Sequence, residues 1–480
     1  MKKTVLISVL LVLVCLLAAA CKSNKGDIEA LASEPAVSTA PADTAEPTAE
    51  PAEESPTAEP TSAPEPSPVP IDPTYEAEAP EGYAVSGASF ELTVMRYSFA
   101  EDGGKVQSPD RVCTVPGARI VPAEPAEEEA AYLEGILDAP YTANFEGTVY
   151  WGYYSPEEKY HGIKKYVDNE LIWDKHYDFN IYTVIDCGEI LVSKAIAYPD
   201  NYRWDTVIVL DPNGNILWQK YVFPDPMGSK CEIMQLLVEE DGTVAVFGRY
   251  GAAEDLLFFR RYSLATGELL ASCDNEGCSA VMWLTEAVRI GGGYAAIYGK
   301  RYNFEQDYFC IVLFDNEGRV TDCVDFAMDG AEIMMTAAAE YNGLLYLSGR
   351  TVKESGDNEL AELTEILCAK GANGKPVYES ASRAEIGMMA REYYNAVLIA
   401  FDTEKFEPVS MLMMEYGSGS ELGLSEGRLI WSACRDIVGE FMSTWQAYSM
   451  TGLVDEYTID TDGSLISIVK TDRYARHATA

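Results

Sequence analysis

Apolar and polar residues alternate in short runs along much of the chain, and tight turns rich in Gly, Asn and Asp join these runs. The stretch 206–222, TVIVLDPNGNILWQKYV, shows the pattern: an apolar alternating run, the turn DPNG and a second alternating run. A period of two is typical of β-strands, and Gly or Asn supplies the positive φ that a tight hairpin needs. The pattern therefore predicts a β-hairpin.

Relatives of this hairpin recur between residues 90 and 470, in two kinds that alternate along the chain. The first kind joins an apolar strand to a shorter strand through turns that centre near Gly104, Asn169, Gly214, Gly267, Gly318, Glu404 and Gly452. The second kind often ends in glycine and a basic residue, and its turns contain Gly147, Gly188, Gly242, Gly292, Gly343, Gly427 and Gly463. Because the two kinds interleave, one repeat contains two hairpins.

The length of the repeat indicates its architecture. Turn glycines of the second kind lie 54, 50 and 51 residues apart between Gly188 and Gly343, and four strands in about 50 residues match a propeller blade. We predict an all-β protein, a β-propeller of four-stranded antiparallel blades, with seven blades and with six or eight as alternatives. The first hairpin of the chain is of the first kind and the last is of the second. We therefore expect the two to pair in a composite blade that leaves no free sheet edge.

Two segments interrupt the period and are predicted to be helical insertions. Residues 124–140 form a short helix with Pro125 in its first turn and Pro140 beyond its end. The second insertion, near residues 352–391, contains DNELAELTEILCAKG, with Asn358 as a candidate cap and Gly371 as a stop signal. Long loops on a rigid scaffold often carry binding residues; the alternative is that both insertions are decorations without a function.

The first 80 residues predict export and attachment to a membrane. Two lysines and an apolar run precede LLAAAC, which resembles the lipobox of bacterial lipoproteins, with Ala18 in the place that usually holds leucine. The resemblance implies a signal peptide over residues 1–20, acylation of Cys21 and a location on the extracytoplasmic face of a bacterial cell membrane. An ordinary secreted protein and a retained anchor are the alternatives. Residues 21–80 are rich in Pro, Ala, Glu and Thr, which favours a disordered stalk ahead of a propeller domain over 81–480.

Charge and cysteine content limit the choice of partners. The formal net charge is −42 at pH 7, so counterion release would not drive binding to phosphates, and we expect no nucleic-acid partner. Of 11 cysteines, Cys15 and Cys21 lie in the predicted signal and lipobox, which leaves an odd number for the domain and excludes complete internal pairing. The sequence contains no CxxC pair, so we expect no zinc site.

Cys310 and Cys323 form a candidate disulfide. In FCIVLFDNEGRVTDC the turn centres between Asn316 and Glu317, which places the two cysteines opposite each other across the hairpin. In a non-hydrogen-bonded pair, opposed Cα atoms lie about 4.5 Å apart, within the range of a disulfide. The alternative is two separate thiols, and a one-residue bulge at the turn would shift the register.

LDPNGNILW resembles the tryptophan-docking repeat of pyrroloquinoline-quinone-type propellers, a family that includes quinone-dependent dehydrogenases and cofactor-free lipoproteins. Asp211, Gly214 and Trp218 match the family's aspartate, glycine and tryptophan. Other repeats depart from the pattern, since Ala271 stands where tryptophan is expected and Trp173 occurs without the glycine. The sequence has no adjacent cysteines of the kind that mark many quinone sites, so we expect no cofactor.

Few residues point to chemistry. His161, His176 and His477 are the only histidines of the sequence, and we assign them surface roles. Asp460 and Asp462 in DTDGS resemble the start of a calcium loop without the later glutamate of an EF-hand, and a simple turn is the alternative. The 30 tyrosines and 7 tryptophans are numerous enough to supply stacking surfaces for sugars.

These features favour a function other than catalysis. We expect a monomeric, lipid-anchored propeller that acts as a binding or assembly scaffold for an unidentified protein or glycan at the cell surface. A surface carbohydrate-active enzyme, hydrolase or lyase, is the first alternative, because among 77 acidic residues some pair must lie at a catalytic separation. A quinoprotein dehydrogenase is the second alternative.

Overall fold

The described part of the chain consists of strands, turns and bends. The computed structural model describes residues 82–99, 104–122, 147–155, 160–198, 204–223, 231–250, 256–279, 284–298, 311–329, 331–353, 394–415, 417–434 and 453–472. The predicted signal, stalk and helical insertions lie outside these residues, apart from Val352 and Lys353, which belong to a strand. Within the described residues, no helix is long and apolar enough to span a bilayer.

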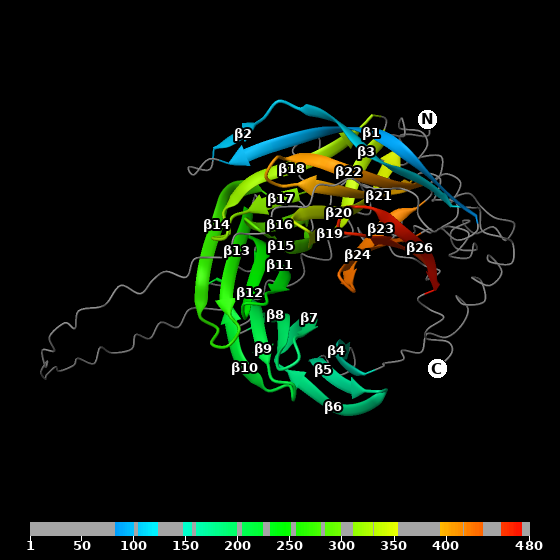
Figure 1. The fold of residues 1–480 in the computed structure, drawn as a ribbon. Helices are drawn as coiled ribbons and strands as arrows, with labels where there is room; N and C mark the ends of the chain where they lie inside the picture. Colours follow the sequence, from blue (N-terminus) through cyan, green and yellow to red (C-terminus); the bar gives the residue numbers. More distant parts are fainter. Residues whose placement is uncertain are drawn as a thin grey trace, which may run out of the picture. The chain divides into compact units, whose positions relative to one another are not determined.

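After residue 147 the described strands form six antiparallel blades in chain order (Figure 1). The first blade contains β4 (Thr148–Ser155), β5 (Tyr160–Val167) and β6 (Glu170–Tyr177). The second contains β7 (Phe179–Asp186), β8 (Leu191–Ala197), β9 (Trp204–Leu210) and β10 (Ile216–Tyr221), and the third β11 (Cys231–Val238), β12 (Thr243–Tyr250), β13 (Leu256–Ser263) and β14 (Leu269–Ser279). The fourth contains β15 (Leu284–Ile290), β16 (Gly293–Tyr298), β17 (Ile311–Phe314) and β18 (Val320–Met328). The fifth contains β19 (Ala331–Tyr341), β20 (Leu344–Lys353), β21 (Tyr394–Asp402) and β22 (Glu407–Glu415), and the sixth β23 (Ser418–Ser425), β24 (Arg428–Cys434), β25 (Leu453–Ile459) and β26 (Leu465–Asp472).

Most successive blades contact each other through their first strands, whereas β11 of the third blade contacts β8 and β9 of the second. β11 lies against β15, β15 against β19, and β19 against β23. Apolar side chains fill the space between blades; for example, Phe247 of the third blade packs edge-on against Tyr294 and Phe314 of the fourth. Repeated four-stranded antiparallel sheets packed in this way are the blades of a β-propeller. The predicted all-β propeller fold is thus confirmed. The number of blades stays a prediction, since the first blade has three described strands and the strands of the fourth and fifth belong to one eleven-stranded sheet.

The first hairpin of the chain does not pair with the last. β1 (Tyr83–Phe99) pairs with β3 (Arg111–Pro122), with the short β2 (Lys105–Gln107) and with β18, the outer strand of the fourth blade. β3 pairs in parallel with β22, the outer strand of the fifth blade. β25 and β26 instead complete the sixth blade with β23 and β24. The predicted composite blade is therefore wrong, because long-range pairing joins the first hairpin to two outer edges in the middle of the chain.

Alternating burial and three ion pairs hold this N-terminal hairpin in place. Phe90, Leu92 and Val94 of β1 are almost fully buried and share a core cluster with apolar residues of the fourth and fifth blades. The basic residues of the hairpin face acids of the two outer strands, in the pairs Arg96–Asp322, Arg111–Glu407 and Arg119–Glu415. The hairpin is therefore part of the folded core and covers two sheet edges that would otherwise be open.

Irregularities recur at equivalent positions in the blades. The register of the outer strands shifts around Ile172, Leu217, Leu270, Thr321, Val409 and Ile466. The first strands of the second to sixth blades shift around Tyr182, Met234, Thr285, Thr336 and Ser420. Bulges increase the local twist and redirect side chains, so the strands that carry them bend at equivalent positions.

The tryptophan-docking contact predicted from LDPNGNILW is present. The indole of Trp218 lies over Gly267 in the turn between β13 and β14, and its Nε1–H donates to the carbonyl oxygen of Leu264 at 2.7 Å. A Cβ on Gly267, whose φ is 66°, would come within 2.8 Å of the indole. The ring of Trp173 lies beside Gly214 of the second blade, where a Cβ would come within 2.9 Å of it, although its indole nitrogen makes no such hydrogen bond. Both tryptophans therefore pack on a turn of the next blade.

Candidate functional site

The short turns of each four-stranded blade lie at the same end of its strands. They join the first strand to the second and the third to the fourth, and antiparallel order brings both turns to the same end. Several begin with an aspartate whose carboxylate accepts backbone hydrogen bonds: Asp211 Oδ1 accepts from the amides of Asn213 and Asn215, at 2.9 and 2.8 Å. These hydrogen bonds, first of all that from Asn215, lower the pKa of Asp211.

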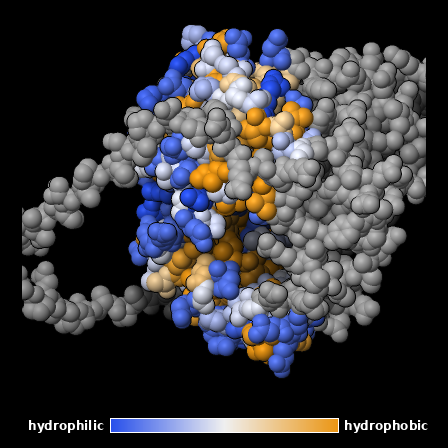
Figure 2. Space-filling model, turned by 45° about the vertical axis from the view of Figure 1, so that its right-hand side comes forward, coloured by the Kyte–Doolittle hydropathy of each residue, from blue (hydrophilic) through white to orange (hydrophobic). Residues whose placement is uncertain are grey.

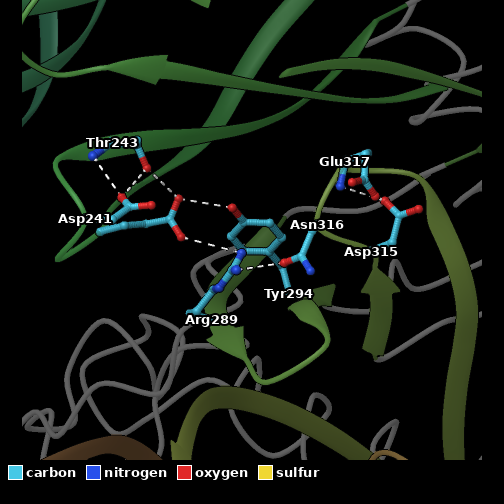
Figure 3. Close-up of polar contacts among 8 residues, drawn as sticks. Asp241, Thr243, Arg289, Tyr294, Asp315, Asn316 and Glu317 are labelled. Carbon is cyan, nitrogen blue, oxygen red and sulfur yellow. Dashed lines mark hydrogen bonds and ion pairs between the residues drawn. The ribbon is translucent and has the colours of Figure 1, made fainter. Parts of the chain in front are cut away.

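A polar cluster joins such turns of the third and fourth blades (Figure 3). Its centre is Glu239, whose side chain is only 8% exposed. The Oε2 atom accepts hydrogen bonds from the hydroxyls of Thr243 at 2.9 Å and of Tyr294 at 3.0 Å. The Nη1 atom of Arg289 lies 3.6 Å from Oε1. The three partners offset the desolvation of this buried carboxylate. Because Tyr294 and Arg289 come from the fourth blade, the cluster connects the third blade to the fourth.

Arg289 extends the cluster towards solvent. Its side chain is 44% exposed, its guanidinium lies 4.6 Å from the centroid of the Tyr294 ring, and Nη2 donates to Asn316 Oδ1 at 2.7 Å. Asn316 belongs to the turn between β17 and β18, where Asp315 accepts from the amides of Glu317 and Arg319. The cluster thus presents a positioned guanidinium and an amide at this end of the strands.

A second, half-buried carboxylate lies on the inner strands. Glu286 directly follows the irregularity of β15, and its Oε2 accepts a hydrogen bond from the amide of Ala338 on β19 at 2.9 Å. Burial, together with the nearby charge of Glu421 on β23, raises the pKa of Glu286 to about 6. Glu286 therefore binds or releases a proton in mildly acidic solution, next to the contact between two blades.

Several predicted site residues lie outside the described part of the chain, namely Cys21, Cys310 and His477. Cys323 is described and faces Val312 on β17, with Tyr97 of β1 on its other side. The register differs from the predicted one because the strand pair is irregular near the turn, between Leu313 and Phe314. Because Cys310 lies outside the described residues, the bridge between Cys310 and Cys323 stays a prediction.

The two predicted calcium candidates belong to a tight turn. Asp460 Oδ1 accepts a hydrogen bond from the amide of Thr461, and Asp462 Oδ1 accepts one from the amide of Ser464 at 2.9 Å. Hydrogen bonds from Ser464 lower the pKa of Asp462. Among the described residues, no group of three His, Cys, Asp or Glu side chains is placed to hold a metal ion, and both carboxylates of this turn accept hydrogen bonds from its own backbone.

Exposed apolar pairs recur on three consecutive outer strands, a feature that the sequence analysis did not single out. Two large apolar residues follow the turn in each, and their exposed fractions lie between 46 and 54%: Leu171 and Ile172, Ile216 and Leu217, Leu269 and Leu270. Figure 2 shows hydrophobic residues among hydrophilic ones on the surface in view. The repeated motif of an apolar pair after the turn, as in NELIW, GNILW and GELLA, could have revealed them.

Comparison with known proteins adds likenesses of fold. No protein-family model and no curated protein matches the chain. A quinohemoprotein alcohol dehydrogenase from Pseudomonas putida is 11% identical, with a TM-score of 0.36 over 79% of this chain and 68% of that one. The β-propeller domain of the Trilobed protease from Pyrococcus furiosus is 10% identical, with a TM-score of 0.35 over 67% of this chain and 82% of that one. A putative 6-phosphogluconolactonase from Bacteroides fragilis is 9% identical, with a TM-score of 0.34 over 80% of this chain and 96% of that one. At TM-scores below 0.5, these likenesses carry no inference about ligand or reaction.

Proposed function

We propose that the protein is a lipid-anchored propeller on the extracytoplasmic face of a bacterial cell membrane, where it binds a protein partner through the outer strands of its first three blades. The exposed apolar pairs carry this proposal. Clustered exposed apolar residues that are rimmed by polar ones are typical of protein interaction sites. LLAAAC and the Pro-rich segment that follows it support the anchor and the stalk.

At the equivalent positions of other blades, apolar residues are buried. Val320 of the fourth blade is 7% exposed and Leu465 of the sixth is 1% exposed, because other parts of the chain cover them. Apolar residues thus occupy this position in covered blades as well. In the first three blades a partner would supply the cover, and burying the exposed half of each side chain would contribute roughly 1 kcal/mol before the costs of association.

A capture experiment with the soluble fragment 81–480 tests the partner surface. The fragment is cross-linked on cells that lack the full-length protein, and the captured protein is compared between the unsubstituted fragment and the double variant Leu217→Lys, Leu270→Lys. We expect the variant to lose the partner. The control variant Val106→Lys, Val112→Lys alters two other exposed apolar residues, on β2 and β3, and should retain it. Equal capture by both variants would contradict the proposed surface.

The anchor has a separate test. Cys21→Ser should abolish labelling with radioactive palmitate and release or mis-process the protein, because the acylated sulfur is removed. Cys15→Ser, which alters the other cysteine of the leader, is the control and should be labelled normally. Labelling that persists in Cys21→Ser would show that another residue carries the lipid.

A further inference from the structure

One face of the first blade carries an exposed tryptophan beside a compact polar cluster. Trp151 on β4 faces Lys164 on β5, and Lys164 faces Asp174 on β6. Tyr153 and His176 flank this row, each opposite Gly162 of β5. Directly opposed residues of neighbouring strands point to the same side of a sheet, so all five side chains share one face.

Asp174 is the centre of the cluster. The hydroxyl of Tyr153 donates to Asp174 Oδ1 at 2.5 Å. The Nζ atom of Lys164 lies 3.7 Å from Oδ2, and Nε2 of His176 lies 3.6 Å from Oδ1. Lys164 Nζ is also 4.4 Å from the centroid of the Tyr153 ring. The carboxylate, the ammonium and the phenol are therefore held in fixed relative positions.

Gly162 leaves room for the ring of Tyr153. A Cβ on residue 162 would lie 2.8 Å from Cε1 and Cζ of Tyr153, which is closer than real contacts allow. The absence of a side chain at Gly162 therefore lets the ring lie across the middle strand and reach Asp174. The opposite face of the sheet is occupied, since Ile163 is fully buried against apolar residues of the second blade.

The cluster is accessible to a ligand. Trp151 is 45% exposed, and the side chains of His176, Lys164 and Asp174 are 49, 31 and 31% exposed. An indole of this kind offers a broad apolar surface, and the groups beside it offer a hydrogen-bond acceptor and two donors. The polar groups are placed to orient a ligand by hydrogen bonds while it contacts the indole.

We propose that this face of the first blade is a binding site for neutral saccharides. One face of a pyranose ring is lined by C–H groups and would pack on the indole of Trp151. The ring hydroxyls would donate to Asp174 and accept from Lys164 and His176. A neutral sugar fits better than an acidic one, because the chain carries a net charge of −42 and the central group of the cluster is a carboxylate. The site shares β6 with the exposed apolar pair of the first blade, but its test needs no protein partner.

The probe is an array of immobilised neutral glycans that covers hexoses, pentoses and N-acetylhexosamines, incubated with the labelled fragment 81–480. The glycan retained best is then titrated calorimetrically against the fragment and three variants. We expect Trp151→Ala and Asp174→Asn each to weaken binding at least tenfold. Tyr221→Ala removes another exposed aromatic residue, on the second blade, and should bind like the unsubstituted fragment.

Two results would overturn the saccharide site. The first is retention of no glycan on the array. The second is unchanged affinity in Trp151→Ala, even though its unfolding curve shows a folded protein. A lower melting temperature in Trp151→Ala, with no array binding by the unsubstituted fragment, would show instead that this face packs against another part of the chain. If Trp151→Ala fails to fold, Asp174→Asn alone decides, because it keeps the size of the side chain.

Discussion

At the scale of single residues, contacts between blades depend on pairs of an aromatic ring and a glycine. Trp173 and Trp218 lie on turn glycines of the following blade, as their spacing in the sequence indicates. The third blade differs, because Ala271 stands at the tryptophan position and Phe259 of β13 contacts Gly318 instead. Such a replacement is invisible in the sequence, since Phe259 comes from a different strand and reaches the glycine only in the folded molecule.

Removing one docked indole should loosen the contact between the second and third blades. Trp218→Ala removes the ring that covers Gly267 and the hydrogen bond to Leu264. We expect a loss of about 3 kcal/mol in the free energy of unfolding, measured with urea. Trp218→Phe keeps most of the ring and should lose about 1 kcal/mol. A loss below that of Trp218→Phe would show that the indole is not part of the cooperative core.

The raised pKa of Glu286 predicts a dependence of stability on pH. Its carboxyl group binds a proton more tightly in the folded state, with a pKa of about 6, than at the ordinary 4.5 of an unfolded chain. The stabilisation is complete below pH 4.5 and is lost as the pH rises through 6, and it amounts to about 2 kcal/mol.

Glu286→Gln should therefore unfold at higher urea concentration than the unsubstituted fragment at pH 7.5. At pH 4.5, where the glutamate is mostly protonated in the folded state, the two proteins should be similar. Glu189→Gln, at an exposed position of a turn, is the control and should follow the unsubstituted fragment. An unchanged pH profile in Glu286→Gln would contradict the assignment.

At the scale of elements, the sequence predicts strands and turns well but not which distant strands pair. The turn glycines Gly214, Gly267 and Gly318 all have positive φ, as the hairpin pattern requires. The partner of the first hairpin depends on contacts across more than 200 residues, and periodicity carries no information about them. The register shift between Leu313 and Phe314 is likewise not visible in the periodicity of the sequence.

The N-terminal hairpin should behave as part of the core. Leu92 of β1 is fully buried, whereas its neighbour Glu91 is exposed. We expect Leu92→Ala to cost about 3 kcal/mol in the free energy of unfolding, because it leaves a cavity. Glu91→Ala should change it by less than about 0.5 kcal/mol. Equal, small effects in the urea titration would show that the hairpin detaches before the blades unfold.

At the scale of the whole molecule, the excess of acidic residues acts on every blade at once. The whole chain carries a net charge of −42, of which residues 1–80 contribute −9, so fragment 81–480 carries −33. This charge opposes compact packing through self-repulsion, and salt screens the repulsion. We expect the melting temperature of fragment 81–480 to rise by about 2 °C or more between roughly 10 and 150 mM NaCl. Potassium chloride at equal ionic strength should raise the melting temperature by the same amount. A fall in melting temperature would show that attractive ion pairs outweigh the repulsion.

The pairing of β1 also determines how the proposed tethered protein would bear mechanical load. β1 begins at Tyr83, and it is bonded to β3 from Tyr83 to Val94 and to β18 from Leu92 to Ser98. Tension in the chain ahead of Tyr83 pulls along this strand, so that many hydrogen bonds share the force instead of breaking one after another. Forced unfolding is governed by the rate of rupture, which such sharing slows. A drag force on the bound partner would therefore stretch the stalk before it opens a blade.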